Sequence, residues 1–402
     1  MLGWHTGRVG DLVASIDAGV SVNGDARRKQ KGEIGVLKVS AVSSTVFDPG
    51  AYKVVINKDL NRVKEPPLKG HIIVSRSNSP ELVGASALVT KNYTDLFLSD
   101  KLWQLKLNKK RKISTKWFAL LLASAPVRYR LSQLATGTSS SMKNISKNDL
   151  LTLPIVIPPI EEQREIARII TAWDNAITVI AQQITTKQEK RKVLMQQLLT
   201  GKQRFPVFTK PWRSVPLGEI FSNRTETGRE DLPLLSITGD GGVVNRNTID
   251  RRDTSSSDKS RYLKICPGDI GYNTMRMWQG VSGLSTLEGI ISPAYTVVTP
   301  DNSLDAEFMA VFFKFEPTIN LFRRYSQGLV DDTLNLKYRH FEKIKVTIPE
   351  KEEQTKIASI FRMINHELEL LEQQLYAYKK QKKGLMQQLL TGKLRVNATQ
   401  TA

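Results

Sequence analysis

The sequence predicts an α+β chain of two globular domains separated by a long antiparallel two-helix coiled coil, with an internal pseudo-two-fold repeat. The segment Leu-Met-Gln-Gln-Leu-Leu-Thr-Gly-Lys occurs at 194–202 and again 191 residues later, at 385–393. Carried backwards without a gap, the same offset aligns Ile157-Pro158 with Ile348-Pro349. Chance does not keep one register over such a span, so we infer an internal duplication.

The duplicated segments agree in sequence, whereas the segments that precede them have diverged. We therefore predict four regions: a globular domain at 1–152, a helical spacer at 153–205, a second globular domain at 206–344, and a second spacer with a tail at 345–402. A common scaffold with different domains is expected if each domain performs a different version of the same task. Further matches are Glu161-Glu162-Gln163 with Glu352-Glu353-Gln354, Ile166-Ala167 with Ile357-Ala358, Trp4 with Trp212, and Gly70-His71-Ile72 with Gly268-Asp269-Ile270.

Each spacer carries apolar residues at alternating gaps of four and three, which indicates a heptad seam. An amphipathic helix must bury its apolar face, and the simplest partner for each spacer is the other, in antiparallel pairing. Ordinary core helices of one domain are the alternative. The polar exceptions in the seam are Lys187, Arg191 and Lys382. The predicted pairing positions are Ile166, Ile170, Trp173, Ile177, Ile180 and Ile184 in the first copy, and Ile357, Phe361, Ile364, Leu368, Leu371 and Leu375 in the second.

The ends of both helices are marked in the sequence. Each helix is expected to begin after Ile-Pro, because proline suits a first turn and disfavours helix before it. Each is expected to end near Thr-Gly-Lys, where Gly201 or Gly392 can adopt a left-handed cap. About forty residues at ~1.5 Å each predict a rod of roughly 60 Å that spaces the two domains.

The composition and net charge of the chain limit the partners and the cellular location that we expect for it. The chain has 402 residues, a formal net charge of +20 and one cysteine, Cys266. The charge suggests a polyanionic partner, nucleic acid first and a membrane surface second, although a basic protein without such a partner is the alternative. No run of 18 apolar residues and no apolar signal core occur, so we expect a cytoplasmic protein that neither crosses a membrane nor is exported.

A search for catalytic motifs was negative. The sequence contains no phosphate-binding Gly-x-x-x-x-Gly-Lys-Ser/Thr loop, no Gly-x-Gly-x-x-Gly loop, no Gly-x-Ser-x-Gly elbow and no Glu-x-Lys of the common metal-dependent nucleases. Its four histidines have no metal-ligand spacing. We therefore predict that the chain is not an enzyme by itself and binds no metal or cofactor of its own.

The two globular domains differ in charge. Residues 1–152 carry 24 Lys and Arg against 11 Asp and Glu, whereas 206–344 carry 17 of each. Strands are expected at 36–39, 72–74 and 295–298, and amphipathic helices at 116–134 and 305–325. Candidate DNA contacts are basic, hydroxyl or amide side chains in predicted loops, although each is otherwise an ordinary surface residue. They are Arg27, Arg28, Lys29, Lys31, Arg76, Ser77, Asn78, Ser140, Lys143 and Asn144 in the first domain, and Arg251, Arg252, Lys259, Tyr272, Asn273 and Arg276 in the second.

Taken together, these motifs resemble the specificity subunit of type I restriction–modification systems over nearly the whole chain. The resemblance implies two target-recognition domains that each read one half of a split double-stranded DNA site, and conserved helices that set the gap between the halves. It also implies two modification subunits, which methylate adenine with S-adenosylmethionine, and restriction subunits, which translocate and cut DNA with ATP and Mg²⁺. The loop at 136–144 matches the family loop before the first conserved region, and its counterpart at 327–335 is acidic.

Two other functions fit the same sequence. A methylation-only specificity protein would serve a modification enzyme that has no nuclease partner. A structural coiled-coil adaptor would have no role in DNA binding, although the basic first domain and the divergence of the duplicated domains weigh against it.

Overall fold

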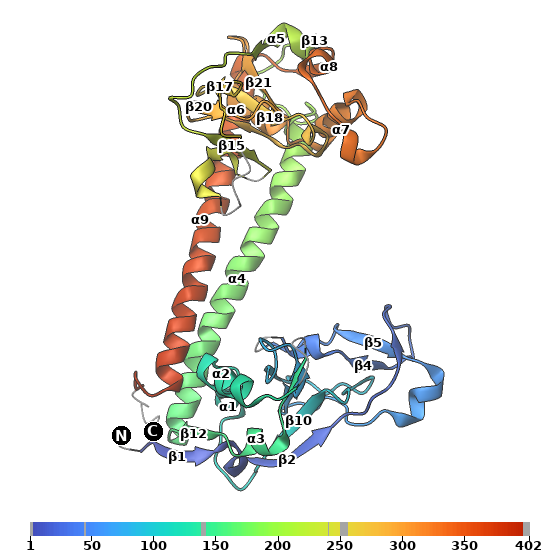
Figure 1. The fold of residues 1–402 in the computed structure, drawn as a ribbon, viewed down its shortest axis with the longest axis vertical. Helices are drawn as coiled ribbons and strands as arrows, with labels where there is room; N and C mark the ends of the chain where they lie inside the picture. The colour runs from blue at the N-terminus through green and yellow to red at the C-terminus, as the bar shows by residue number, and fades with distance from the viewer. Residues whose placement is uncertain (1–2, 44–45, 138–141, 240, 250–255, 397–402) are drawn as a thin grey trace. The chain divides into compact units, whose positions relative to one another are not determined.

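The computed structural model describes residues 3–43, 46–137, 142–239, 241–249 and 256–396. The chain divides into two units, each containing one mixed α/β domain and parts of both long helices (Figure 1). Unit 1 combines 1–180 with 374–402, and unit 2 is the continuous segment 181–373. The predicted α+β class with an internal repeat is confirmed.

The domain of unit 1 contains two four-stranded sheets. The first is antiparallel, in the order β2-β10-β6-β8, and the second has the order β3-β5-β4-β9, with β4 and β9 parallel. The strands predicted at 36–39 and 72–74 lie in β4 and β6, but Val39 already begins a 3₁₀ turn. The bounds are β2 Val13–Ala18, β10 Leu102–Leu107, β6 Ile72–Ser75, β8 Ser86–Leu88, β3 Gly24–Asp25, β5 Tyr52–Val55, β4 Gly35–Leu37 and β9 Leu96–Phe97.

The domain of unit 2 repeats the first of these sheets in the order β14-β21-β18-β19 and adds the pairs β15-β16 and β17-β20. The strand predicted at 295–298 lies within β21. The bounds are β14 Phe221–Arg224, β21 Tyr295–Pro300, β18 Ile270–Asn273, β19 Ser282–Leu284, β15 Leu235–Thr238, β16 Gly242–Asn245, β17 Leu263–Ile265 and β20 Gly289–Ile291.

Short helices and one strand pair complete each unit. The first strand of each unit pairs antiparallel with the strand before a long helix, as β1 with β12 and β13 with β22. The bounds are β1 His5–Arg8, β12 Pro154–Ile157, β13 Arg213–Pro216, β22 Lys345–Ile348, α3 Lys147–Leu151, α5 Leu217–Ile220 and α8 Tyr338–Phe341. The 3₁₀ segments are η1 Val9–Asp11, η2 Val39–Val42, η3 Asn57–Arg62, η4 Arg246–Thr248, η5 Met277–Gln279 and η6 Asp331–Thr333.

The two amphipathic helices predicted at 116–134 and 305–325 are each broken into two. The first consists of α1, Thr115–Leu122, and α2, Ala125–Leu134; the second consists of α6, Ala306–Phe312, and α7, Glu316–Tyr325. A proline stands in the first turn of both α2 and α7. Proline cannot donate the helical hydrogen bond and clashes with the preceding turn, so a new helix begins at this point in both copies.

The two long helices begin and end where the sequence predicted. Helix α4 spans Ile160–Leu198 and α9 spans Lys351–Leu390, each after an Ile-Pro pair. Beyond their ends, Gly201 has φ +68° and Gly392 has φ +71°. These left-handed conformations favour glycine because glycine has no Cβ atom to clash with the backbone.

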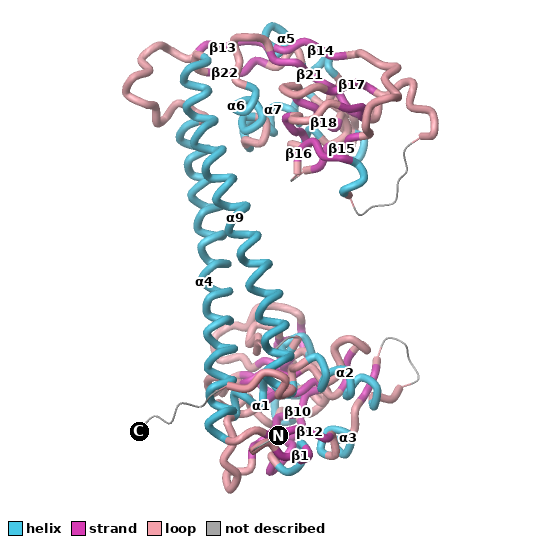
Figure 2. Tube along the Cα trace, turned by 90° about the vertical axis from the view of Figure 1, so that its left-hand side faces the viewer, coloured by secondary structure: helices cyan, strands magenta, loops and turns pink. Residues whose placement is uncertain are grey.

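In unit 1, the parts of α4 and α9 run antiparallel and pair through the predicted seam (Figures 1 and 2). The rings of Trp173 and Tyr378 meet edge-on at 5.3 Å between centroids. The polar seam residue Lys382 donates from Nζ to Asp174 Oδ1 at 2.5 Å. Of the predicted pairing positions in this unit, Ile166, Ile170 and Ile180 are buried, and Trp173, Ile177 and Leu375 are partly buried.

In unit 2, the remaining parts of the two helices pair in the same antiparallel sense. The polar seam residue Lys187 binds Glu367, and Arg191 Nε donates to Asn365 Oδ1 at 2.9 Å. Cations therefore occupy the seam because each meets an acidic or amide partner across it. In this unit Ile184, Ile357 and Phe361 are buried, and Ile364, Leu368 and Leu371 are partly buried.

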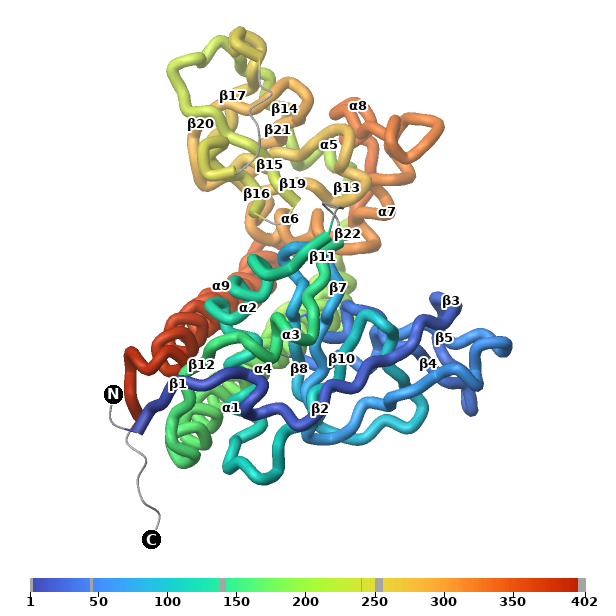
Figure 3. Tube along the Cα trace, turned by 60° about the horizontal axis from the view of Figure 1, so that its bottom comes forward, coloured from blue at the N-terminus to red at the C-terminus, as the bar shows by residue number. Residues whose placement is uncertain are grey.

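A buried glutamate closes unit 1 by joining three distant parts of the chain. Glu162, in the first turn of α4, accepts from Trp4 Nε1 at 2.7 Å. Its two oxygens also receive Arg395, at 2.7 Å from Nε and 2.8 Å from Nη2. The start of the chain is thereby held beside the segment after α9 (Figure 3).

Unit 2 is closed by the same three residue types. Glu353, in the first turn of α9, accepts two hydrogen bonds from Arg204, at 2.9 and 2.7 Å, and one from Trp212 Nε1 at 3.3 Å. Arg204 follows α4, and Arg395 follows α9. The segment after α4 therefore binds the first turn of α9 in unit 2, and the segment after α9 binds the first turn of α4 in unit 1. We call these two arrangements the glutamate clasps.

A second contact links each domain to its long helix in both copies. The Gln163 side chain accepts from the Ser114 N–H that precedes α1, and the Gln354 side chain accepts from the Asp305 N–H that precedes α6, both at 2.9 Å. Each glutamine also donates to the carbonyl of the proline before its helix, at 2.9 Å. Both glutamines are buried, so the repeated Glu-Glu-Gln motif is an internal joint.

Candidate nucleic-acid interface

The first predicted basic segment of unit 1 is partly neutralised by acidic neighbours. Arg27 makes a two-pronged ion pair with Glu33, at 2.7 and 2.6 Å, and this hydrogen bonding lowers the pKa of Glu33 to about 2. Lys29 pairs with Asp95. Arg28 and Lys31 are exposed and take part in neither of these two ion pairs, so they present their charges to solvent.

The second predicted cluster follows β6, and most of it is structural. Strand β7, Ser77–Asn78, pairs with β11, Lys143–Asn144. Ser77 is 4% exposed and Asn78 is 9% exposed, because Asn78 Nδ2 donates to Ser75 Oγ at 3.2 Å under the strand pair. The prediction that Ser77 and Asn78 contact DNA is therefore wrong for the structure as it stands. Arg76, partly buried, lies over the Trp103 ring at 5.7 Å.

The two described ends of the Gly/Ser-rich loop, 136–137 and 142–144, lie side by side on this strand pair and form the base of a hairpin. Its base is the bridge between Thr136 and Asn144, and the following Ile145 N–H donates to the Arg76 carbonyl at 2.9 Å. Lys143 Nζ donates to the Gly137 carbonyl at 2.9 Å. Ser140 lies outside the described residues. The fold thus brings two candidate segments together that lie far apart in the chain.

In unit 2, the predicted DNA contact Tyr272 is instead a core residue. Its ring is fully buried and stacks on Phe341 at 5.4 Å between centroids. Burial raises the pKa of its hydroxyl. A side chain enclosed on the inner face of β18 cannot reach DNA, so this prediction is wrong.

The other candidates of unit 2 lie nearer the surface. Arg276 is exposed at the start of η5, and the Asn273 side chain accepts from the Met275 N–H at 3.0 Å, which shapes the turn before it. Lys259 is partly buried and lies over the Tyr262 ring at 5.0 Å. Arg251 and Arg252 lie outside the described residues.

A second hairpin, at 327–335, occupies in unit 2 the place that 136–144 occupies in unit 1. Its base is the bridge between Gln327 and Asn335, 191 residues after the first. The following Leu336 N–H donates to the Thr274 carbonyl at 2.8 Å, as Ile145 does to Arg76. Both hairpins therefore dock on the segment that follows the third strand of the four-stranded sheet. We call them the first and second hairpins.

Two arginines beside the second hairpin were missed by the sequence reading. Arg323 pairs with Asp331 of the hairpin at 2.7 Å and lies over the Trp278 ring at 5.2 Å. Arg324 follows it and is exposed. The basic last turn of α7 was visible in the sequence, but only folding brings it to the hairpin and to η5. This domain has no excess of positive charge, yet it gathers three arginines, including Arg276, around one hairpin.

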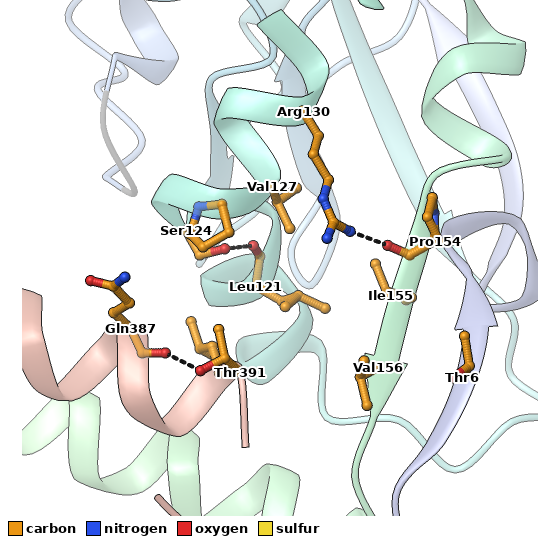
Figure 4. Close-up of a pocket in the computed structure, with 12 residues that line it drawn as sticks. Thr6, Leu121, Ser124, Val127, Arg130, Pro154, Ile155, Val156, Gln387 and Thr391 are labelled. Atoms are coloured by element: carbon orange, nitrogen blue, oxygen red, sulfur yellow. Dashed lines mark hydrogen bonds between the residues drawn. The ribbon is translucent and has the colours of Figure 1, made fainter. Parts of the chain in front are cut away.

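An apolar cavity of about 410 Å³ lies in unit 1 between α1, α2, β12 and the last turn of α9 (Figure 4). Leu121, Val127 and Leu390 are among its lining residues, and Arg130 spans its rim to the Pro154 carbonyl at 3.2 Å. In unit 2, the positions equivalent to Leu121 and Ser124 are occupied by two buried phenylalanines, Phe312 and Phe315. The two copies thus differ in packing here.

The residues that the structure describes include neither a metal-binding cluster nor a membrane-spanning helix. No group of three or more His, Cys, Asp and Glu side chains there could hold a metal ion. Over the same described ranges, no helix is long and apolar enough to cross a membrane.

Comparison with known proteins finds similarity to one family. Residues 1–188 match the family model described as the type I restriction modification DNA specificity domain. The chain is 33% identical over 159 residues to the specificity subunit of the type I restriction enzyme EcoEI of Escherichia coli, covering 39% of this chain and 27% of that one. It is 23% identical over 407 residues to the putative type I restriction enzyme MjaX specificity subunit of Methanocaldococcus jannaschii, covering 93% and 91%.

Solved structures share the fold. The specificity subunit of a type I restriction–modification system from M. genitalium superposes with a TM-score of 0.58 at 16% identity, over 96% of each chain. A chain from a structure that describes complex assembly and conformational transition of the type I system gives a TM-score of 0.60 at 18% identity, over 98% of this chain and 99% of that one.

Proposed function

We propose that the chain is a DNA-specificity subunit of a type I restriction–modification system, not itself an enzyme, and that it reads a split double-stranded DNA site, one half with each domain. Its similarity to the family model over 1–188 and to specificity subunits of two organisms supports this proposal. The observation that carries this proposal is the repeat itself. The glutamate clasps and the buried glutamines are the same in both units, whereas the two hairpins differ in charge and polarity. Two copies of one scaffold with different surfaces suit the reading of two different half-sites.

The same proposal assigns the chemistry to partner subunits. Two modification subunits would dock on the paired helices and methylate adenine with S-adenosylmethionine, and restriction subunits would supply ATP-dependent and Mg²⁺-dependent translocation and cleavage in the cytoplasm. The chain itself would contribute specificity and the distance between the half-sites. Its basic first domain would add phosphate contacts that hold the complex on DNA.

A genome-wide map of adenine methylation, recorded by single-molecule sequencing with and without the gene, tests this function. We expect a split motif that is fully methylated in the parent strain and unmethylated in the deletion strain. Restoring the gene should restore the motif. An unchanged map in a strain that expresses the modification subunits would contradict the proposal and would favour an adaptor role. Methylation without cutting of unmodified DNA would indicate a methylation-only system.

Exchange of one domain tests the assignment of half-sites. Replacing residues 1–152 with the corresponding domain of another family member should change one half of the methylated motif and leave the other half and its sequence intact. The reciprocal exchange of 206–344 should change the other half. A change in both halves after a single exchange would contradict the modular arrangement.

A further inference from the structure

The tip of the second hairpin presents an apolar side chain to solvent. Leu329 is 100% exposed and the neighbouring Val330 is 60% exposed. The hairpin follows α7 and projects from the domain beside it (Figure 1). Single exposed apolar residues are common on protein surfaces, so exposure alone indicates nothing. The hydrogen bonds and the backbone conformation that hold the hairpin indicate a role for Leu329.

Several local interactions keep the hairpin in one shape. Gly328 has φ +146°, and a Cβ added there would lie 2.6 Å from the Thr333 carbonyl oxygen. Asn335 Nδ2 donates to the Gln327 and Thr333 carbonyls, at 3.1 and 3.3 Å. The Val330 N–H donates to Thr333 Oγ1 at 3.2 Å. The side chain of Leu329 therefore stands on a fixed support, which limits the conformational entropy lost on contact with a partner.

The charges around the tip suit DNA. Arg276 and Arg324 are exposed on the two segments that flank the hairpin, where they can reach phosphates. Arg323 holds Asp331 in an ion pair, so Asp332 is the exposed carboxylate beside the tip that lacks this partner. A carboxylate is repelled by phosphates, but it accepts from the amino group of cytosine, which lies in the major groove.

We propose that Leu329 reads a thymine in the half-site of the second domain, by packing against the 5-methyl group in the major groove. Arginines at the flanks hold the phosphates, and the hairpin inserts its apolar tip between them. The contact distinguishes thymine from the other three bases, because the methyl group is the apolar feature of the major-groove edge. The sequence of the first hairpin contains hydroxyl and basic residues instead, so the two half-sites are read by different chemistry. This inference rests on the proposed function.

Uracil substitution provides the test, because uracil lacks only the 5-methyl group of thymine. The full chain is purified with its modification subunits, and its affinity is measured for a duplex carrying the motif from the methylation map. Each thymine of the second domain's half-site, on either strand, is replaced in turn by uracil. We expect one replacement to weaken binding about fourfold, the value of one buried methyl group. For Leu329→Ala, binding to the thymine duplex should fall by a similar factor, and the uracil replacement should cause no further loss.

Leu287→Ala is the matched control, since it removes the same atoms from another exposed leucine of unit 2. It should keep both the parental affinity and the uracil penalty. The inference is overturned if no thymine occurs in this half-site, if no uracil replacement matters to the parent protein, or if Leu329→Ala retains the full penalty. If the complex formed by Leu329→Ala lost a protein subunit, and uracil had no effect on the parent complex, the inference would also be overturned. The tip would then be assigned to protein docking. Failure of the parent complex to bind the motif at all would instead contradict the proposed function.

Discussion

The two hairpins are held by equivalent backbone contacts and differ in the charge and polarity of their sequences. Each closes with one bridge and donates a backbone N–H to the segment after the third sheet strand. The first hairpin is basic and rich in hydroxyls, and the second ends in Leu329 and two aspartates. The comparison teaches that the duplicated units share the backbone contacts that hold the hairpins, whereas the sequences of the hairpins themselves have diverged.

The interior of the two units shows the opposite behaviour. Glu162 and Glu353 have the same kinds of partner in the glutamate clasps, as do Gln163 and Gln354 at the next position. These contacts join each domain to the helices, so a change in one would disturb folding rather than specificity. The difference between conserved joints and divergent tips can be tested by perturbing each kind of residue.

The largest effect is expected in the helical seam. Ile177→Asp combined with Leu368→Asp places an unpaired carboxylate in the partly buried seam of each unit. We expect a loss of about 2–3 kcal/mol for each change, and loss of assembly with the modification subunit. Thermal unfolding and co-purification with that subunit would measure both.

Val179→Asp with Leu370→Asp is the matched control, because these residues of the same helices are 51% and 50% exposed. This pair should leave thermal unfolding close to that of the parent. If the seam double variant assembled normally, the two helices would not pair as the structure has them.

A smaller effect is expected in the glutamate clasps, and it should differ between the units. The Glu353 side chain is 1% exposed and its partner Arg204 is 24% exposed, whereas in unit 1 Arg395 is 39% exposed. We therefore expect Glu353→Gln to lower the free energy of unfolding by about 2 kcal/mol, and Glu162→Gln by less, because solvent screens its partner. Glu350→Gln, which removes the ion pair with the exposed Lys210 and leaves the hydrogen bonds of the clasp in place, should have a much smaller effect.

The clasp of unit 1 should also respond to acid. Burial opposes ionisation of Glu162, but hydrogen bonds from Arg395 and Trp4 outweigh it and hold its pKa below the usual 4.5. Because the pKa of Glu162 is lower in the folded chain than in the unfolded chain, its ionisation stabilises the folded state at pH values above the ordinary pKa. This stabilisation is lost as the pH falls through the pKa of the folded state. The gap in stability between the parent and Glu162→Gln should therefore narrow below about pH 4.5. A gap that stays constant between pH 7 and pH 3 would contradict this assignment.

The smallest effect is expected at single surface cations. For DNA binding, Arg28→Ala or Lys31→Ala should weaken affinity for all sequences alike and reduce the slope of log affinity against log salt by about 1. Removing Arg27 and Glu33 together, which deletes an ion pair without changing net charge, should leave the slope unaltered. Sequence-dependent losses at Arg28 or Lys31 would indicate base contacts instead. Binding titrations at several salt concentrations measure the slopes.

The two long helices could be predicted because their sequences are periodic and repeated. The offset of 191 residues, the heptad seam and the Ile-Pro and Thr-Gly-Lys boundaries located both long helices to within a few residues. The breaks at Pro126 and Pro317 followed from proline chemistry but were overlooked, because the apolar pattern continued across them.

The site was less predictable because exposure depends on non-local packing. Tyr272 lies on a strand whose first three residues are all buried, and its stacking on Phe341, far along the chain, could not be read from the local sequence. Ser77 and Asn78 are covered by β11, which comes more than sixty residues later. Arg323, Arg324 and Leu329 carried no motif, and their importance arises from the way α7 and the second hairpin fold together.

The division of the chain into units has a consequence for protein synthesis. Unit 2 is one continuous segment, 181–373, and can complete its contacts as soon as it has left the ribosome. Unit 1 needs residues from 374 onwards, including Arg395 for its clasp with Glu162. The domain that is translated first is therefore the one that finishes folding last, and until then the apolar face of its part of α4 stays uncovered.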